Sequence, residues 1–442
     1  MNVVLIAIDT LRAGRLECYG YGRRTSPALA GLAREGILYE SFSAPSIPTD
    51  PSFASLYTGL PDYGHRIAGV IPPRPVAEGA PWLPQMFADA GYFTCALDSL
   101  QGHGEFFARG WQDYSWPGMG HDKEAGVKRN AEVTTGAAVD LLDRLPSGDP
   151  FLMFVHYWDP HTPYLPPAPY DGMFYEGDPT DPRHTSMRDV RAFPGPGTGW
   201  IDADVTDAQY VAAQYDAEIA YNSEHLLALF DELKRRGLYE DSLIVAFADH
   251  GEVLTGHEGH FDHHGLYEDN IHVPLIIRLP KGEGAGRRVP DMAAMTDLPV
   301  TLLRAAGLAV PPQMEGLDLL EVAAGRGESP HGNLFLGEGT WQVKRGVRTR
   351  DWKFIRAASD SYEHNFHGTA PRELYNLESD PGEQANLVNV EPLVAAELER
   401  RLDDWLVRMK DRYGWEDPLL EDGPTLLKPR DKDKLTPASE IL

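Results

Sequence analysis

Cysteine, basic residues and long apolar stretches are all scarce in this chain of 442 residues. Its two cysteines, Cys18 and Cys95, are too few for a disulfide framework and are expected to be cytosolic thiols. The 40 Lys and Arg residues against 67 Asp and Glu residues give a formal net charge of −27. This charge argues against nucleic acid and anionic membranes as partners, because phosphate binding needs basic patches. No apolar stretch is long enough to span a membrane.

The remaining composition is that of a globular protein, with 42% hydrophobic and 24% charged residues, so a large core can form. The length predicts one large domain and a smaller one. The chain opens directly into an apolar run, without the charged and apolar segments of a signal peptide, and we therefore expect a cytoplasmic location. The oligomeric state stays open, a homo-oligomer included.

Three short apolar runs end in residues that can bind metal ions or move protons. They are Val3–Ile8 before Asp9, Phe151–Val155 before the segment His156-Tyr157-Trp158-Asp159-Pro160-His161, and Leu243–Ala248 before Asp249 and His250. Apolar runs of this length are typical of buried parallel strands. Ligands of open α/β sheets bind beyond the carboxyl ends of such strands. If the three runs are neighbours in one sheet, their polar ends form an active site.

Strand-like and helix-like segments alternate over the first two thirds of the chain, which predicts an α/β fold with helices covering a sheet. A long helix is expected after Thr206, because Thr206 and Gln209 form a capping-box pattern and apolar residues then recur at helical spacing. The preceding stretch, Pro166–Thr206, is rich in Pro, Gly and Asp. It reads as a long surface loop that forms a wall of the substrate site.

The pattern changes after about Pro330, which predicts a first domain of residues 1–330 and a second of residues 331–442. Short strands separated by turns indicate a small antiparallel sheet. The strands are expected at Leu334–Leu336, Val343–Arg348, Trp352–Ile355 and Leu374–Leu377. A helix at Glu391–Lys410 and an extended tail from Glu421 follow them.

A histidine-rich loop follows the third apolar run. Five histidines lie within fifteen residues, namely His250, His257, His260, His263 and His264. A single histidine here would be explained by an ordinary solvated polar loop. Five histidines are harder to explain in this way, because the preceding strand does not need them to fold. Carboxylates beside imidazoles suit a divalent cation, so we expect a metal site here, with His257 and His260 as substrate contacts.

The segment Ser43–Gly59 allows two interpretations of Thr49. Pro51 suits a helix start, so Thr49 or Asp50 could serve only as the helix cap. Alternatively, the Thr49 hydroxyl lies beside a helix N-terminus and near a cation, which is where an anionic ester binds.

Taken in order, the motifs resemble the sulfatase family of the alkaline phosphatase superfamily over nearly the whole chain. The matching segments are IAIDTLRAGRLECYGY, PSFASLYTG, FVHYWDPHTPYLPP, YDAEIAYNSEHL, IVAFADHGE, LYEDNIHVPLIIR, TDLPVTLLRAAGL and GVRTRDWKFIR…ELYNLESDPGEQANL. Their order and spacing are specific for the fold. The resemblance implies a large mixed or parallel sheet between helices, followed by a smaller antiparallel-sheet subdomain.

The resemblance also implies site residues. Asp9, Asp249 and His250 match metal ligands, and Thr10 stands where many members have a second Asp. The implied cofactor is one divalent ion, either calcium, manganese or magnesium. His161 matches the histidine that contacts the ester or its leaving group. Either His263 or His264 falls where members have Lys or His before the pair that is Tyr267-Glu268 here.

The main departure from the family lies at Thr49. The family motif is Cys or Ser, any residue, Pro, Ser and Arg, and this chain reads Thr49-Asp50-Pro51-Ser52-Phe53. Family sulfatases oxidise the Cys or Ser to formylglycine, which Thr cannot become, so no formylglycine is expected. Phe53 replaces the Arg. Of the usual Lys and His after the second strand, only His103 offers a match.

We therefore predict a metal-dependent hydrolase of a sulfate ester or a related phosphate or phosphonate ester, acting on a small anionic substrate. Thr49 is the nucleophile and contacts the metal, while His161 and either His263 or His264 handle the leaving group. One alternative is an inactive sulfatase-like protein that binds an anionic ligand. Another is a phosphodiesterase or phosphotransferase with a Thr nucleophile, because related enzymes use an unmodified Ser or Thr.

Overall fold

The computed structural model describes the whole chain except residues 73, 116–120, 123–126, 129, 193–197, 258–259, 327–330, 359–364, 367–369, 426–434 and 437–442. Within the described part, eight strands form a large mixed sheet in the order β11-β2-β10-β9-β1-β8-β4-β5. In that order the strands are Arg287–Ala294, Ile37–Ser43, Leu275–Arg278, Ser242–Phe247, Asn2–Ile8, Phe151–Tyr157, Phe93–Leu97 and Asp113–Ser115.

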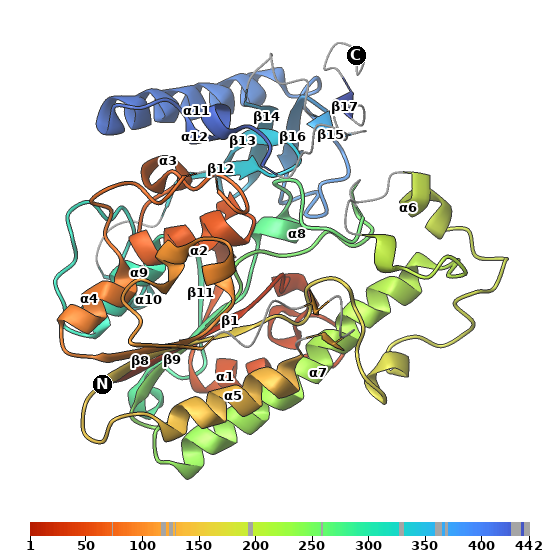
Figure 1. Cartoon of the computed structure of the whole chain (residues 1–442). Helices are drawn as coiled ribbons and strands as arrows, with labels where there is room; N and C mark the ends of the chain where they lie inside the picture. The colour runs from red at the N-terminus through yellow and green to blue at the C-terminus, as the bar shows by residue number, and fades with distance from the viewer. Residues whose placement is uncertain are drawn as a thin grey trace.

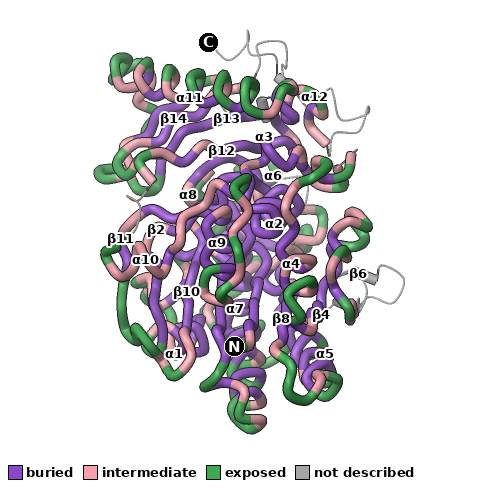
Figure 2. Tube along the Cα trace, turned by 90° about the vertical axis from the view of Figure 1, so that its left-hand side faces the viewer, coloured by how far each residue is buried: buried purple, intermediate pink, exposed green. Residues whose placement is uncertain are grey.

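The three apolar runs predicted to be neighbouring strands are confirmed at the centre of this sheet. Strand β1 pairs in parallel with β8 on one side and with β9 on the other. All residues of β8 are buried (Figure 2), and so are all residues of β9, as expected for central strands covered on both faces. The parallel direction brings the ends of β1, β8 and β9 to one edge. Strand β10 runs antiparallel to β9, so the sheet is mixed.

Helices cover both faces of the large sheet, which confirms the α/β class (Figure 1). One layer contains α1 (Pro27–Glu35), α5 (Ala131–Asp143) and α7 (Ala208–Arg235). The other contains α2 (Thr49–Thr58), α4 (Leu83–Asp89), α9 (Asp297–Ala305) and α10 (Leu319–Ala323). Shorter helices are α3 (Asp62–His65), α6 (Met187–Ala192) and α8 (Glu268–Ile271).

Helix α7 has a different cap from the one that the sequence predicted. The Asp207 carboxylate accepts a hydrogen bond from the Gln209 backbone N–H, so Asp207 is the N-cap. The Thr206 hydroxyl instead donates to the carbonyls of Pro179 and Asp181 in the preceding loop. The capping-box prediction is wrong because Thr206 finds partners outside the helix, while the adjacent Asp207 is itself a favoured N-cap residue.

The predicted C-terminal antiparallel sheet is confirmed, with one addition. Its order is β16-β14-β13-β12-β3. The strands are β12 (Leu334–Gly339), β13 (Val343–Arg348), β14 (Trp352–Ala357), β16 (Arg372–Asn376) and β3 (Ser46–Ile47). Strand β3 comes from the N-terminal part of the chain and pairs in parallel with β12.

Helix α11 (Pro392–Tyr413) packs on the small sheet through an apolar cluster that includes Leu402, Trp405 and Phe354. Helix α12 (Pro418–Asp422) follows it, and most of the predicted extended tail lies outside the described residues. Short strand pairs are β6 (His121–Asp122) with β7 (Val127–Lys128), and β15 (Asn365–Phe366) with β17 (Leu435–Thr436). Among the described helices, none combines the length and the apolar character needed to cross a membrane.

Candidate active site

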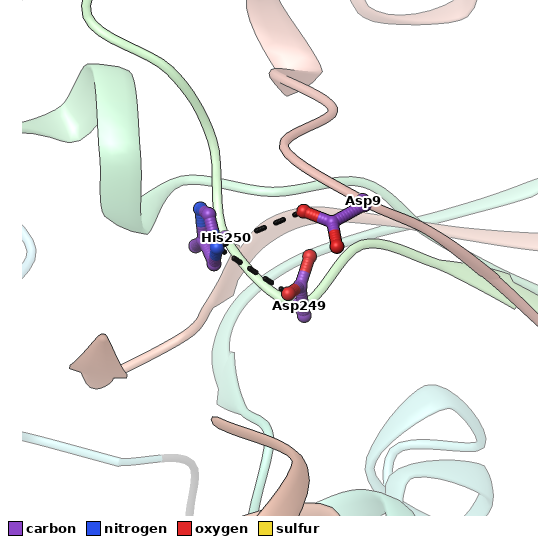
Figure 3. A group of neighbouring side chains, drawn as sticks. All are labelled: Asp9, Asp249 and His250. Carbon is purple, nitrogen blue, oxygen red and sulfur yellow. Dashed lines mark ion pairs between the residues drawn. The ribbon is translucent and has the colours of Figure 1, made fainter. Parts of the chain in front are cut away.

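The ends of β1 and β9 bring Asp9, Asp249 and His250 together (Figure 3). One ligand atom from each of the three side chains lies within 4.8 Å of the other two. His250 Nε2 is 3.8 Å from Asp9 Oδ1 and 3.4 Å from Asp249 Oδ2. All three residues are fully buried. The predicted metal ligands therefore form one compact group beyond the carboxyl ends of adjacent parallel strands.

The chemistry of this group fits a divalent cation. Both oxygens of Asp9 and Oδ2 of Asp249 are buried without a hydrogen-bond partner. Burial and the nearby Asp9 charge raise the pKa of Asp249 to about 6. Buried carboxylates without partners are costly unless a cation compensates them. His250 Nδ1 lies 2.9 Å from the Gly251 carbonyl oxygen, which leaves Nε2 directed at the carboxylates.

Thr10 takes part in this group mainly through its backbone. Its N–H donates to Asp249 Oδ1 at 3.3 Å, and its carbonyl accepts from the Tyr215 hydroxyl at 2.7 Å. The backbone is left-handed here, with φ of 55°. The Thr10 hydroxyl is buried and has no hydrogen-bond partner.

The hydroxyl of Thr49 faces the same group from the start of α2. Its Oγ lies 3.1 Å from His250 Nε2. Pro48 is the N-cap of α2, without a side-chain cap, so the interpretation of Thr49 or Asp50 as the helix cap is wrong. The Ser52 hydroxyl donates to the Asp249 carbonyl at 2.6 Å and ties the first turn of α2 to the end of β9.

His103 reaches this region through Asp50. The Asp50 carboxylate contacts His103 Nδ1 at 2.6 Å and accepts the backbone N–H of Ile71 at 2.7 Å. Asp50, the residue after Thr49, therefore holds the segment that contains Ile71 and orients the His103 ring.

His161 and His263 lie on the other side of His250. The His263 ring centroid is 5.1 Å from that of His161 and 4.8 Å from that of His250. Burial lowers the pKa of His161 to about 4. Burial would also lower the pKa of His263, but the carboxylates of Asp262 and Glu252 raise it to about 9. The pKa values of these two neighbouring imidazoles are thus shifted in opposite directions, a pattern that suits acid–base chemistry.

The remaining histidines of the loop point elsewhere. His264 stacks on Trp341 with ring centroids 5.6 Å apart, toward the small sheet. His257 lies parallel to the Tyr267 ring at 3.7 Å. His257 and His260 both line a separate cavity of about 360 Å³. The structure therefore brings His263 to the metal group and places His257 and His260 in another cavity.

His156 and Asp98 are two site residues to which the sequence analysis assigned no role. His156 Nε2 lies 3.2 Å from Asp9 Oδ2, and its Nδ1 lies 2.9 Å from Asp98 Oδ1. Phe53, at the family Arg position, packs edge-on against the His156 ring with centroids 4.9 Å apart. The sequence signal for both residues was a polar side chain at the end of an apolar strand.

Comparisons with known proteins identify the family of the chain. The family model described as "Sulfatase" matches residues 1–308, which is more than half of the chain, and the model "N-sulphoglucosamine sulphohydrolase, C-terminal" matches residues 256–412. An uncharacterized sulfatase, YidJ, of Escherichia coli is 25% identical over 93% of this chain and 87% of its own length. An N-acetylglucosamine-6-O-sulfatase of Bacteroides thetaiotaomicron is 23% identical over 87% of this chain and 82% of its own length.

Solved structures share the fold. A protein in complex with its substrate D-glucosamine-2-N,6-O-disulfate matches with a TM-score of 0.75 and 20% identity, covering 93% of this chain and 98% of that one. A phosphonate monoester hydrolase of Agrobacterium radiobacter matches with a TM-score of 0.74 and 21% identity, covering 93% and 96%. From the match of the sulfatase model to residues 1–308, we conclude that this chain belongs to the sulfatase family of ester hydrolases.

Proposed function

We propose that this chain is a metal-dependent hydrolase of a sulfate ester or a related phosphate or phosphonate ester, with Thr49 as the nucleophile. One observation carries the proposal. The Thr49 hydroxyl is 3.1 Å from His250 Nε2, within a buried group of carboxylates and imidazole, and it plays no part in capping its helix. A buried hydroxyl beside these candidate metal ligands supports a role in the chemistry.

Asp9, Asp249 and His250 would hold one divalent ion, calcium, manganese or magnesium, with the hydroxyls of Thr49 and Thr10 beside them. When bound, such an ion would polarise the ester and favour deprotonation of the attacking hydroxyl. Both oxygens of Asp9 and Oδ2 of Asp249 support this assignment, because they accept no hydrogen bond within the part of the chain that the structure describes.

The protein's own groups divide the remaining work. In the proposed reaction the Thr49 hydroxyl gives its proton to Nε2 of the neutral His161, the Thr49 oxygen bonds to sulfur or phosphorus, and the ester bond to the leaving alcohol breaks. His263, whose pKa is raised to about 9, gives its proton to the leaving oxygen. Water then cleaves the Thr49 ester and releases the anion. His161 Nδ1 donates to the Thr162 carbonyl at 2.8 Å, so its Nε2 can stabilise the charged oxygen through a hydrogen bond only after it has taken up the proton of Thr49. His264 is a weaker candidate than His263, because it stacks on Trp341.

We propose substrate contacts both beside Thr49 and farther from it. His103, oriented by Asp50, would contact the anion near Thr49. His257 and His260 line the separate cavity and would meet a more distant part of a larger substrate. Relatives of known name include sugar sulfatases, and phosphonate monoester hydrolases share the fold, so both ester classes belong in the test.

A second candidate function is binding of an anionic ligand without turnover. Phe53 favours it, because its ring is fully buried against His156 and Phe154 where the family has an arginine. A phosphodiesterase or phosphotransferase reaction through Thr49 remains the other alternative.

Two further assignments are also proposals. We place the domain boundary near residue 330, with the catalytic α/β part before it and the C-terminal α+β part after it. We also propose a cytoplasmic location, which is supported by Cys18 and Cys95 being free thiols.

A substrate screen tests the proposed function. Purified protein loaded with Ca²⁺, Mn²⁺ or Mg²⁺ is assayed on an aryl sulfate, a phosphate diester and a phosphonate ester. We expect turnover of at least one ester, and we expect Asp249→Ala to abolish it together with metal uptake. If no ester is turned over, but sulfate or phosphate binds in titration calorimetry, the anion-binding alternative is correct.

A further inference from the structure

We infer that His156 is an additional nitrogen ligand of the metal centre, held in place by Asp98. This assignment rests on the proposed metal site and extends it by one residue. The residues Asp9, His156 and Asp98 come from the ends of β1, β8 and β4, which are consecutive strands of the large sheet. All three side chains are buried.

Asp98 determines which nitrogen of His156 carries a proton. Its Oδ1 accepts the backbone N–H of Ser99 at 2.7 Å, and its Oδ2 accepts the Tyr114 hydroxyl at 3.0 Å. A carboxylate that accepts these bonds acts as an acceptor toward its third neighbour, His156 Nδ1, at 2.9 Å. The proton of a neutral His156 therefore lies on Nδ1, and Nε2 presents a lone pair.

The lone pair of Nε2 is directed at another acceptor. It lies 3.2 Å from Asp9 Oδ2, so in the absence of a cation a proton on Nε2 pairs the ring with that carboxylate. A divalent cation can take the place of this proton, because imidazole ligands bind metal ions in their deprotonated form. Ligand atoms bound to one ion at about 2.1 Å come to about 3 Å from each other, so the spacing fits shared coordination.

His250 shows the same arrangement from the opposite side of Asp9. Its Nδ1 is fixed by the Gly251 carbonyl, and its Nε2 faces Asp9 Oδ1. Asp9 is thus flanked by one imidazole at each oxygen. An outer carboxylate or carbonyl on each Nδ1 is the usual support of a metal-binding histidine. Phe53 packs against the His156 ring and restricts its rotation.

Two imidazole nitrogens change the expected metal. Ca²⁺ prefers sites made of oxygen only, whereas imidazole with carboxylate suits first-row transition ions. Of the three ions named above, Mn²⁺ therefore fits best, and we expect it to displace Ca²⁺ from the wild-type protein.

The test counts metal-bound nitrogens. Electron–nuclear double resonance of Mn²⁺ bound to the wild-type protein should resolve two imidazole nitrogens, and His156→Gln should show one. Calorimetry with Mn²⁺ should show an affinity loss on the order of 10–100-fold for His156→Gln and a smaller loss for Asp98→Asn. His331→Gln is the matched control, because it removes another histidine–aspartate pair, with Asp297, and should leave both readouts unchanged.

The outcomes separate this inference from the proposed function. Wild-type protein that takes up no divalent ion would refute the metal centre itself. Mn²⁺ uptake with a single nitrogen coupling would show that both nitrogens of His156 carry protons, and would refute only the assignment of His156. The count in the wild-type protein decides the question even if His156→Gln does not fold.

Discussion

The substitution Thr49→Ala tests whether the Thr49 hydroxyl acts in catalysis or only stabilises the fold. Thr49 is 6% exposed, so Thr49→Ala deletes a buried methyl group and the contact with His250. The methyl contributes about 0.8 kcal/mol and the hydrogen bond about 1 kcal/mol. Because α2 has no side-chain cap, no capping energy is added. We therefore expect a loss of about 2 kcal/mol in the free energy of unfolding, which a folded domain tolerates.

The effect of Thr49→Ala on turnover should be far larger than its effect on stability. Loss of a nucleophile lowers kcat by about 10⁴-fold or more. Thr49→Ser keeps the hydroxyl and should retain part of the activity, whereas Thr49→Val keeps the shape and should be as inactive as Thr49→Ala. The assay is kcat on the best ester from the screen, together with Mn²⁺ stoichiometry and urea denaturation of each variant. Mass spectrometry of acid-quenched wild-type protein should find sulfate or phosphate on Thr49.

Two results would refute this reasoning. If Thr49→Val keeps kcat within a few-fold of wild type, a water molecule attacks the ester and the Thr49 hydroxyl is dispensable. If Thr49→Val and Thr49→Ser lose activity equally, while both are folded and metal-loaded, packing around the side chain matters and the hydroxyl does not.

Three other predictions follow from buried groups. Asp249→Ala should abolish the bound metal in elemental analysis, and unchanged metal content would contradict the assigned ligand. Arg345→Met should cost about 3–5 kcal/mol in chemical denaturation, because it leaves the buried carboxylates of Asp62 and Asp417 unpaired, while the exposed Arg350→Met should cost little. Burial lowers the pKa of His65 to about 3, so its stabilising contribution is complete above pH 6.5 and is lost as the pH falls. Between pH 6.5 and 5 the free energy of unfolding of the apoprotein should therefore fall by about 2 kcal/mol more than that of His65→Gln, as measured by chemical denaturation.

The sequence predicted the features that depend on local pattern. Buried parallel strands must be apolar along their length, so β1, β8 and β9 were visible as runs, and their ends indicated Asp9 and Asp249. The four longer strands of the small sheet were found for a similar reason, because turns separate them. Strand β3 was missed, because two residues, Ser46 and Ile47, form no pattern and their partner lies almost 300 positions away.

Side-chain partners could not be predicted in the same way. Thr49 and Thr206 both fit a capping pattern, and in each case a residue distant in sequence or outside the helix provides the actual partner. The link from Asp98 to His156 depends on the strand order β1-β8-β4, which no local pattern encodes. The path of the histidine-rich loop likewise places His263 beside His250 and His257 in another cavity, although only six positions separate the two residues in the sequence.

The short strand β3 makes the catalytic part depend on the last quarter of the chain. Ser46 and Ile47 lie against Gly337 and Glu338 of β12, and α2 begins two residues after β3 ends. A chain cut before residue 331 would keep Asp9, Asp249 and His250 but would leave the peptide leading to Thr49 without its partner strand. Such a fragment would take up metal yet turn over no ester, so ion loading alone would be a misleading sign of an intact enzyme. The two parts should therefore be expressed and engineered as one unit.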